Sequence, residues 1–116
     1  LPDLERQLAS DLERNAELYK RKAEEFIAKV ESTRDAQFPG IPLVMGEAAT
    51  YCSSMMMRWE ERSEAYWSII EHTVGLLKRK GYWGCMPRTN SGPEDPVWTE
   101  FPERLRRVNK LFLEGE

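Results

Sequence analysis

Cysteine and histidine are scarce in this sequence, which has two cysteines and one histidine among 116 residues. Cys52 and Cys85 are too few for a disulfide framework, and neither belongs to the CxxC pairs typical of a structural zinc site. We therefore expect both thiols to be reduced, as in a cytoplasmic protein. His72 stands alone, without a motif that would pair it with a nucleophile.

A long apolar run is also missing. No stretch of about 18 apolar residues occurs that would span a membrane as a helix, and no signal peptide is visible. The charges nearly cancel, with 20 acidic against 17 basic residues and a net charge of −3. Such a balance provides no strong field for a nucleic acid or an anionic membrane, so neither is expected as a partner.

Glycine is absent from the first 35 residues, where Pro2 is the only proline. Apolar or small side chains recur there every ~3.7 residues, which is a helical period and predicts one long helix over residues 3–35. These side chains are Leu4, Leu8, Leu12, Ala16, Tyr19, Ala23, Phe26 and Val30. The FPGIPL stretch at 38–43 then predicts a turn, because its prolines and glycine do not continue a helix.

A second helix is predicted over residues 45–80. Its apolar seam repeats every ~3.5 residues, which is the heptad value of a coiled coil. The seam consists of Ala49, Cys52, Met56, Trp59, Ser63, Tyr66, Ile70, Thr73 and Leu77. Three cations at residues 78–80 suit a helix C-terminus, and Gly81 follows as the stop signal.

Residues 81–98 hold three glycines and three prolines, which predict an irregular crossing. Its aromatic side chains argue against a solvated linker. A short third helix is predicted over residues 100–113, because Phe101, Leu105, Val108 and Phe112 line one face. Pro102 suits the first turn of such a helix.

Together these elements indicate an all-α fold, a long antiparallel helical hairpin with a short C-terminal helix, in a single domain over residues 1–116. The apolar stripe of the second helix is wider than the seam of a two-stranded coil. We therefore expect a homodimer that completes a helical bundle. The expected interface with itself or another protein comprises Trp59, Tyr66, Trp67, Ile69, Ile70, Val74, Leu76, Leu77, Trp83, Trp98 and Phe101.

Metal chemistry is the main alternative in the stretch from Tyr51 to Trp67. The heptad register scatters its methionines and Cys52 around the helix, which favours core packing over a copper site. The carboxylates remain candidates for a metal site, unlike the methionines. Glu61, Glu64 and the following Glu71 share the outer face of the helix, and carboxylate pairs of this kind can hold Mg²⁺. Glu24 and Glu25 could face them, although a matching second motif with aspartate is absent.

Two further candidates are a thiol and a basic cluster. Cys85 follows the second helix and lies near Arg88, which would lower its pKa and make it reactive. Arg104, Arg107 and Lys110 lie near one side of the third helix and are a candidate anion contact.

Three functions remain open. We favour a non-catalytic helical module for oligomerisation and protein–protein interaction, of the adaptor, regulator or inhibitor type, with no cofactor. The second hypothesis is an Mg²⁺-dependent all-α nucleotide hydrolase that uses the helix carboxylates. The third is a nucleic-acid accessory protein that uses the basic C-terminal helix.

Overall fold

The computed structural model describes residues 2–46, 63–85 and 101–115. The elements in these ranges are α1 (Pro2–Arg14), α2 (Ala16–Gln37), β1 (Val44–Met45), α3 (Glu64–Arg79), β2 (Gly84–Cys85) and α5 (Pro102–Glu114). Helices make up most of the described residues, as an all-α fold requires. Predictions that rest on residues 47–62 or 86–100, including those for Cys52, Trp59, Glu61 and Trp98, lie outside this part of the chain.

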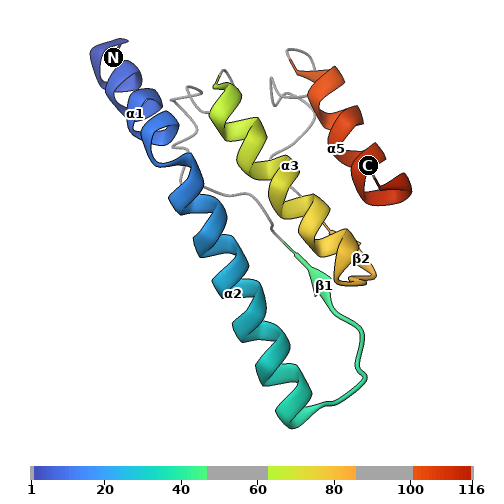
Figure 1. Cartoon of the computed structure of the whole chain (residues 1–116). Coiled ribbons are helices and arrows are strands. Elements are labelled where there is room, and N and C mark those ends of the chain that lie inside the picture. The colour runs from blue at the N-terminus through green and yellow to red at the C-terminus, as the bar shows by residue number, and fades with distance from the viewer. Residues whose placement is uncertain (1, 47–62, 86–100, 116) are drawn as a thin grey trace.

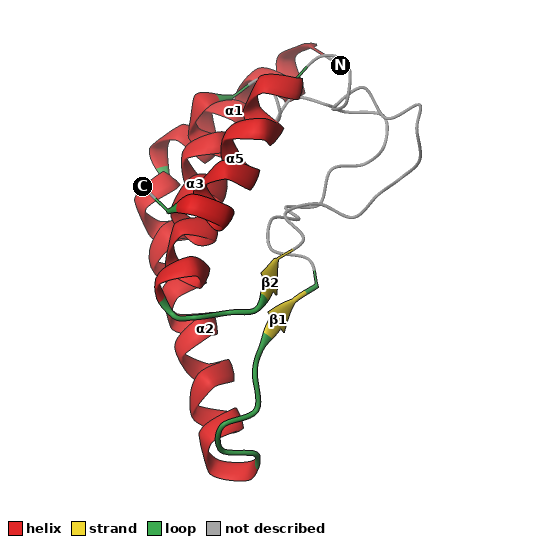
Figure 2. Cartoon of the chain, turned by 90° about the vertical axis from the view of Figure 1, so that its right-hand side faces the viewer, coloured by secondary structure: helices red, strands yellow, loops and turns green. Residues whose placement is uncertain are grey.

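The helices lie side by side in one layer, with α3 in the middle (Figure 1). The continuous pair α1 and α2 flanks α3 on one side, and α5 flanks it on the other. Strands β1 and β2 lie against one face of this layer (Figure 2). They pair in parallel, with Val44 opposite Gly84 and Met45 opposite Cys85.

Helices α2, α3 and α5 all run in the same direction (Figure 1). Glu24 of α2 lies against His72 of α3, and Glu31 of α2 lies against Lys80, which directly follows α3, so the two helices run in parallel. The predicted antiparallel hairpin therefore differs from the arrangement of the described helices. After the turn at residues 38–43 the chain forms strand β1 instead of entering a helix directly, and α3 begins only at Glu64.

The predicted helix over residues 3–35 is present as two helices that meet at Asn15. Helical hydrogen bonding continues through the break, from Asn15 N to Asp11 O and from Tyr19 N to Asn15 O, both at 3.0 Å. The Asn15 side-chain amide also donates to the Asp11 carbonyl at 3.0 Å. A polar side chain that competes for a helix carbonyl disturbs the local turn, which explains the break.

The predicted second helix is shorter over the described residues, because Met45 belongs to a strand and α3 spans Glu64–Arg79. Its end agrees with the sequence, since Gly81 adopts a φ of +78° and its N–H reaches the Lys78 carbonyl at 3.1 Å. Glycine reaches this left-handed conformation without steric cost. The third helix is α5, which begins at Pro102 and ends at Glu114.

Helix α3 supplies most of the hydrophobic core. Half of its 16 residues are buried, because α1, α2 and α5 pack on its sides. Met45 of β1 and Cys85 of β2 pack on the cluster that contains Leu77. One cluster joins Leu12 of α1 and Val108 of α5 to the N-terminal half of α3. A second cluster joins Ile27 of α2 to Leu77 and Tyr82.

The molecule is elongated, with principal extents of 47 × 28 × 25 Å. The last turns of α2, after Glu31, reach beyond the end of α3, and of the described segments the returning chain before β1 lies beside them (Figure 1). No helix among the described residues is both long enough and apolar enough to cross a membrane.

The central position of Ile69 predicts a large effect of truncation. Ile69 is fully buried, so we expect Ile69→Ala to lower the free energy of unfolding by about 2–5 kcal/mol. Ser32→Ala on the exposed side of α2 should change it by less than about 0.5 kcal/mol. Urea unfolding of both variants measures the difference, and similar values would contradict this description of the core.

Candidate interaction surface

An apolar groove lies between the C-terminal half of α2 and the returning chain at residues 38–43. It has a volume of about 610 Å³. Helix α2 contributes Phe26, Lys29, Val30, Thr33, Arg34 and Gln37, and the returning chain contributes Phe38, Ile41 and Leu43. Its size falls within the range of known ligand pockets.

Large hydrophobic side chains of this groove are open to solvent. Phe26 is 57% exposed, Phe38 is 58% exposed and Ile41 is 50% exposed. Val44 and Trp83 extend the exposed apolar surface next to the groove, where the Trp83 N–H donates to the Leu43 carbonyl at 2.9 Å. Contiguous apolar surface of this kind is typical of a site where another molecule binds.

Local hydrogen bonds hold the returning chain beside α2. The Phe38 N–H caps the helix by donating to the Arg34 carbonyl at 2.6 Å, and the Ile41 N–H donates to the Phe38 carbonyl at 3.2 Å. Gly40 makes this turn possible with a φ of +83°. Arg34 Nη1 then donates to the Ile41 carbonyl at 2.9 Å, which ties the two walls of the groove together.

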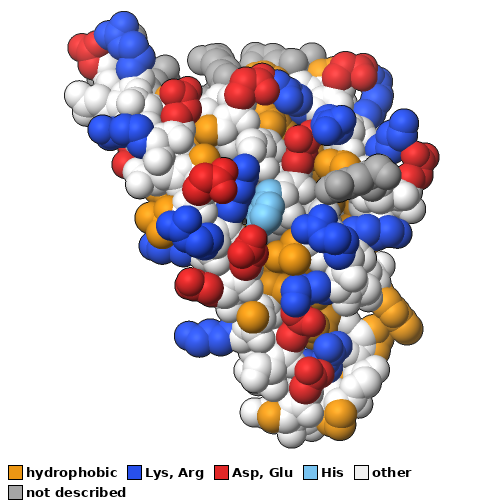
Figure 3. All heavy atoms as spheres, viewed as in Figure 1, with side chains coloured by type: hydrophobic (Ala, Val, Ile, Leu, Met, Phe, Trp, Pro, Cys, Tyr) orange, Lys and Arg blue, Asp and Glu red, His pale blue; other side chains and the backbone are white. Residues whose placement is uncertain are grey.

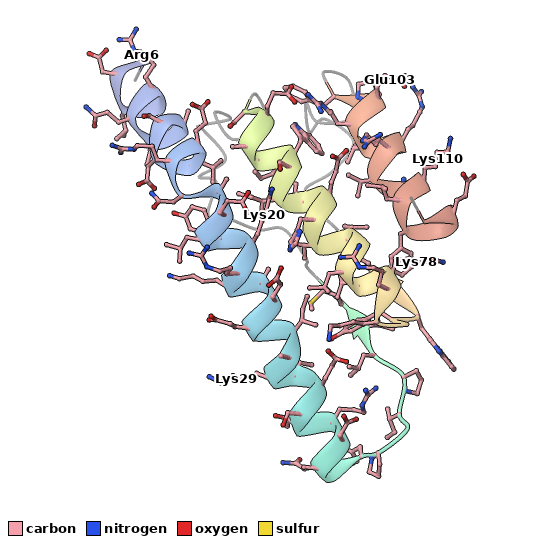
Figure 4. All side chains as sticks on the ribbon, in the orientation of Figure 1. Arg6, Lys20, Lys29, Lys78, Glu103 and Lys110 are labelled. Atoms are coloured by element: carbon pink, nitrogen blue, oxygen red, sulfur yellow. The ribbon has the colours of Figure 1, made fainter. Side chains whose placement is uncertain are left out.

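The charged residues that line the groove in the described part of the chain, Lys29 and Arg34, are both cationic. Arg34 is partly neutralised by Asp35, whose Oδ1 atom lies 2.6 Å from Arg34 Nε. Lys29 has no ion pair with any other residue of the described ranges. Figure 4 shows its side chain extending from the outer side of α2, away from α3. The groove therefore combines apolar walls with a positive rim.

Two of the carboxylates proposed for Mg²⁺ are instead paired with arginines, and the third, Glu61, lies outside the described residues. Glu64 forms an ion pair with Arg104, and Glu71 forms one with Arg107. Glu24 does not face Glu64, because its Oε1 atom lies 2.8 Å from His72 Nε2. No cluster of three potential metal ligands occurs within the described ranges.

The same pairs occupy the candidate anion contact. Arg104 and Arg107 face glutamates of α3, and Lys110 Nζ lies 3.9 Å from Glu114 Oε2. A depression of about 490 Å³ between α3 and α5 includes Arg107 and Lys110, but Glu71 also lines it. Figure 3 shows this face of the molecule, where both signs of charge alternate around His72. The arrangement favours α3–α5 cohesion over binding of a polyanion.

Most of the residues predicted to form an interface with another chain belong instead to the hydrophobic core of this chain. The buried ones are Tyr66, Trp67, Ile69, Ile70, Val74 and Leu77. Phe101 packs on this core, with its ring centroid 6.2 Å from that of Trp67, and Leu76 packs on the second cluster. Trp83 differs from these, because it is 77% exposed. The wide stripe of α3 thus packs largely against α1, α2 and α5 of its own chain.

The groove is not predicted by the sequence pattern. The apolar period places Phe26 and Val30 on the inward stripe of the first helix, whereas in the structure Ile27 is 1% exposed and Phe26 faces solvent. The adjacent pair Phe26–Ile27 was the sequence feature that could have indicated the exposed phenylalanine, because neighbouring residues of a helix cannot both face the same core. Its prolines and glycine predict only a turn for the FPGIPL stretch, whereas Phe38, Ile41 and Leu43 of this stretch form one wall of the groove.

Cys85 differs from the predicted reactive thiol. It is half-buried in strand β2 and packs against both core clusters. Burial raises the pKa of the Cys85 thiol from 9.0 to about 11, so the thiol is less ionised than usual. Arg88, which was expected to lower this pKa, lies outside the described residues.

Comparison with known proteins identifies no relative. No protein-family model matches the chain, and neither a curated protein nor a solved structure matches it.

The raised pKa predicts slow alkylation of Cys85. In a Cys52→Ser background, we expect Cys85 to react with iodoacetamide at pH 8 roughly 100-fold more slowly than an ordinary thiol, because its thiolate is correspondingly rare. The rate should climb as the pH rises toward 11. Mass spectrometry at timed intervals measures this, and a rate near that of free cysteine would contradict burial of the thiol.

The α3–α5 ion pairs predict a charge-swap effect. Glu71→Lys places two cations together at Arg107, so we expect the free energy of unfolding to fall by about 0.5–1 kcal/mol. Adding Arg107→Glu should restore most of this loss, because the swapped pair is again attractive. A double-mutant cycle in urea measures the coupling, and purely additive effects would argue against the contact.

Proposed function

We propose that this protein is a non-catalytic helical module that associates with another protein chain through the apolar groove. The observation that carries the proposal is the joint exposure of Phe26, Phe38 and Ile41 along one groove. A second copy of the chain and an unrelated partner protein are both possible occupants, and homodimerisation into a larger helical bundle is one form of the same function.

The exposed area supports reversible association. Each half-exposed phenylalanine leaves on the order of 100 Å² of apolar surface in water, which is about half of what the side chain can bury. At about 25 cal/mol per Å², covering Phe26 and Phe38 contributes ~5 kcal/mol before the entropic cost of association. Ile41 and Leu43 add to this contribution. A partner that covers the whole groove would therefore bind detectably without becoming permanently attached.

The two alternative functions draw less support from the described residues. An Mg²⁺-dependent hydrolase needs free carboxylates, but Glu64 and Glu71 are engaged by arginines. A nucleic-acid accessory protein needs free cations, but Arg104 and Arg107 are engaged by the same glutamates. Using either set would first require breaking the contacts that help to hold α5 on α3.

The groove hypothesis predicts that one aspartate abolishes association. Phe26→Asp places a charge where a partner would bury the ring, whereas Ala28→Asp adds the same charge at an exposed position of α2 outside the groove. We expect only Phe26→Asp to lose the dimer mass in light scattering, or to lose a protein that the native chain captures from a cell extract. Both variants should keep the native melting temperature within a few degrees.

If the native chain, Phe26→Asp and Ala28→Asp have the same mass and capture the same proteins, the groove does not mediate association and the proposal fails.

A further inference from the structure

We propose that the occupant of the apolar groove is an amphipathic α-helix of a partner protein, with acidic side chains beside its apolar stripe. This inference rests on the proposed function, since it assumes that the groove binds another chain. It adds the conformation, the charge and the source of the bound segment.

The length of the groove suits a helix. Along α2 it runs from Phe26 to Gln37, which corresponds to about 16 Å at 1.5 Å per residue, or three helical turns. An occupying helix of that length presents three or four apolar side chains at i, i+3 or i+4, and i+7. The walls offer matching apolar surface at Phe26 and Val30 on one side and at Phe38, Ile41 and Leu43 on the other.

The backbone of the returning chain is poorly suited to bind a β-strand. Pro39 and Pro42 have no N–H group. The Ile41 N–H is donated to Phe38 and its carbonyl accepts from Arg34, while the Leu43 carbonyl accepts from Trp83. Strand addition relies on a row of free main-chain donors and acceptors. Because most of these groups are absent or already bonded, side-chain packing must supply the affinity, as it does for a bound helix.

The charge of the groove selects an acidic occupant. Among the described residues, its charged lining residues are Lys29 and Arg34, and none of the described acidic side chains lines it. Arg34 has Asp35 as a neighbour, so Lys29 provides most of the uncompensated positive charge. A glutamate or aspartate of the bound helix next to Lys29 would complete an ion pair at the rim of the contact. Such rim pairs contribute mainly to specificity and to the rate of association.

The bound helix is expected to come from another protein, because the short described helices of this chain already bury their apolar faces in its own core. Within residues 2–46, 63–85 and 101–115, the short amphipathic helices are α1 and α5, and both use their apolar faces in the core. Leu12 of α1 is 3% exposed and Val108 of α5 is 1% exposed, and both belong to the cluster around α3. Neither helix is free to leave this core for the groove of a second copy without exposing it. A separate protein is therefore the expected donor.

A matched pair of peptides tests the proposal. The probes are two fluorescent helical peptides of about four turns, with leucines at i, i+4 and i+7 and with either glutamates or lysines beside them. Fluorescence anisotropy measures their Kd values for the native chain, Lys29→Glu, Phe26→Asp and Arg21→Glu. Arg21 is exposed on α2 and does not line the groove, so its variant controls for net charge.

We expect the native chain to bind the glutamate peptide about tenfold more tightly than the lysine peptide, which is a typical effect of charge complementarity at an interface. Lys29→Glu should reverse this preference, Phe26→Asp should abolish both interactions, and Arg21→Glu should leave the preference unchanged. A melting curve for each variant establishes that it remains folded.

The other outcomes overturn the inference and separate it from the proposed function. Equal binding of the two peptides, or a preference that Lys29→Glu does not alter, shows that the occupant is not an acidic helix, while the groove remains a binding site. If neither peptide binds but light scattering finds a dimer that depends on Phe26, a second copy fills the groove. If neither peptide binds and Phe26→Asp changes no association at all, the proposed function fails as well.

Discussion

The burial of helix α3 is the constraint on which the rest of this structure depends. Six apolar side chains on several sides of this helix are at most 4% exposed, namely Tyr66, Trp67, Ile69, Ile70, Val74 and Leu77. A single neighbouring helix covers only one stripe of another helix. Helices α1 and α2, helix α5 and the segment around Tyr82 therefore have to surround α3, and each of them gains its own stability from that contact.

Charge reinforces this arrangement at the edges of the layer. The ion pairs between α3 and α5 and the contacts of Glu24 and Glu31 with α3 lie along the two seams of the helical layer. Partly exposed pairs of this kind add little stability but penalise misaligned helices, because a slipped register brings like charges together. The sequence suggests a cation site at the glutamates of α3 and an anion site at the arginines of α5. In the structure these two sets of side chains neutralise each other.

The apolar groove lies where α2 extends past the end of α3. Glu31 of α2 pairs with Lys80, which directly follows α3, so none of the described helices lies beside the last turns of α2. Leu43 of the returning chain packs on the cluster that contains Ile27. Phe26, Phe38 and Ile41 nevertheless remain exposed to solvent. Covering them with a partner lowers the free energy of the assembly without any change in the monomer core. A binding surface can therefore exist here without weakening the fold.

By itself the sequence determined the helical class, the stop at Gly81, the start of α5 near Pro102 and the inward seam of α3, where Ser63, Tyr66, Ile70, Thr73 and Leu77 are all buried. These features are local, because periodicity, proline and glycine act within a few residues. Only the tertiary structure decided the parallel direction of α2 and α3, the pairing of Glu71 with Arg107 and the exposure of Phe26 beside a buried Ile27. Each of these depends on which segment, distant in sequence, packs against a given face, and the period of an isolated helix does not encode that choice.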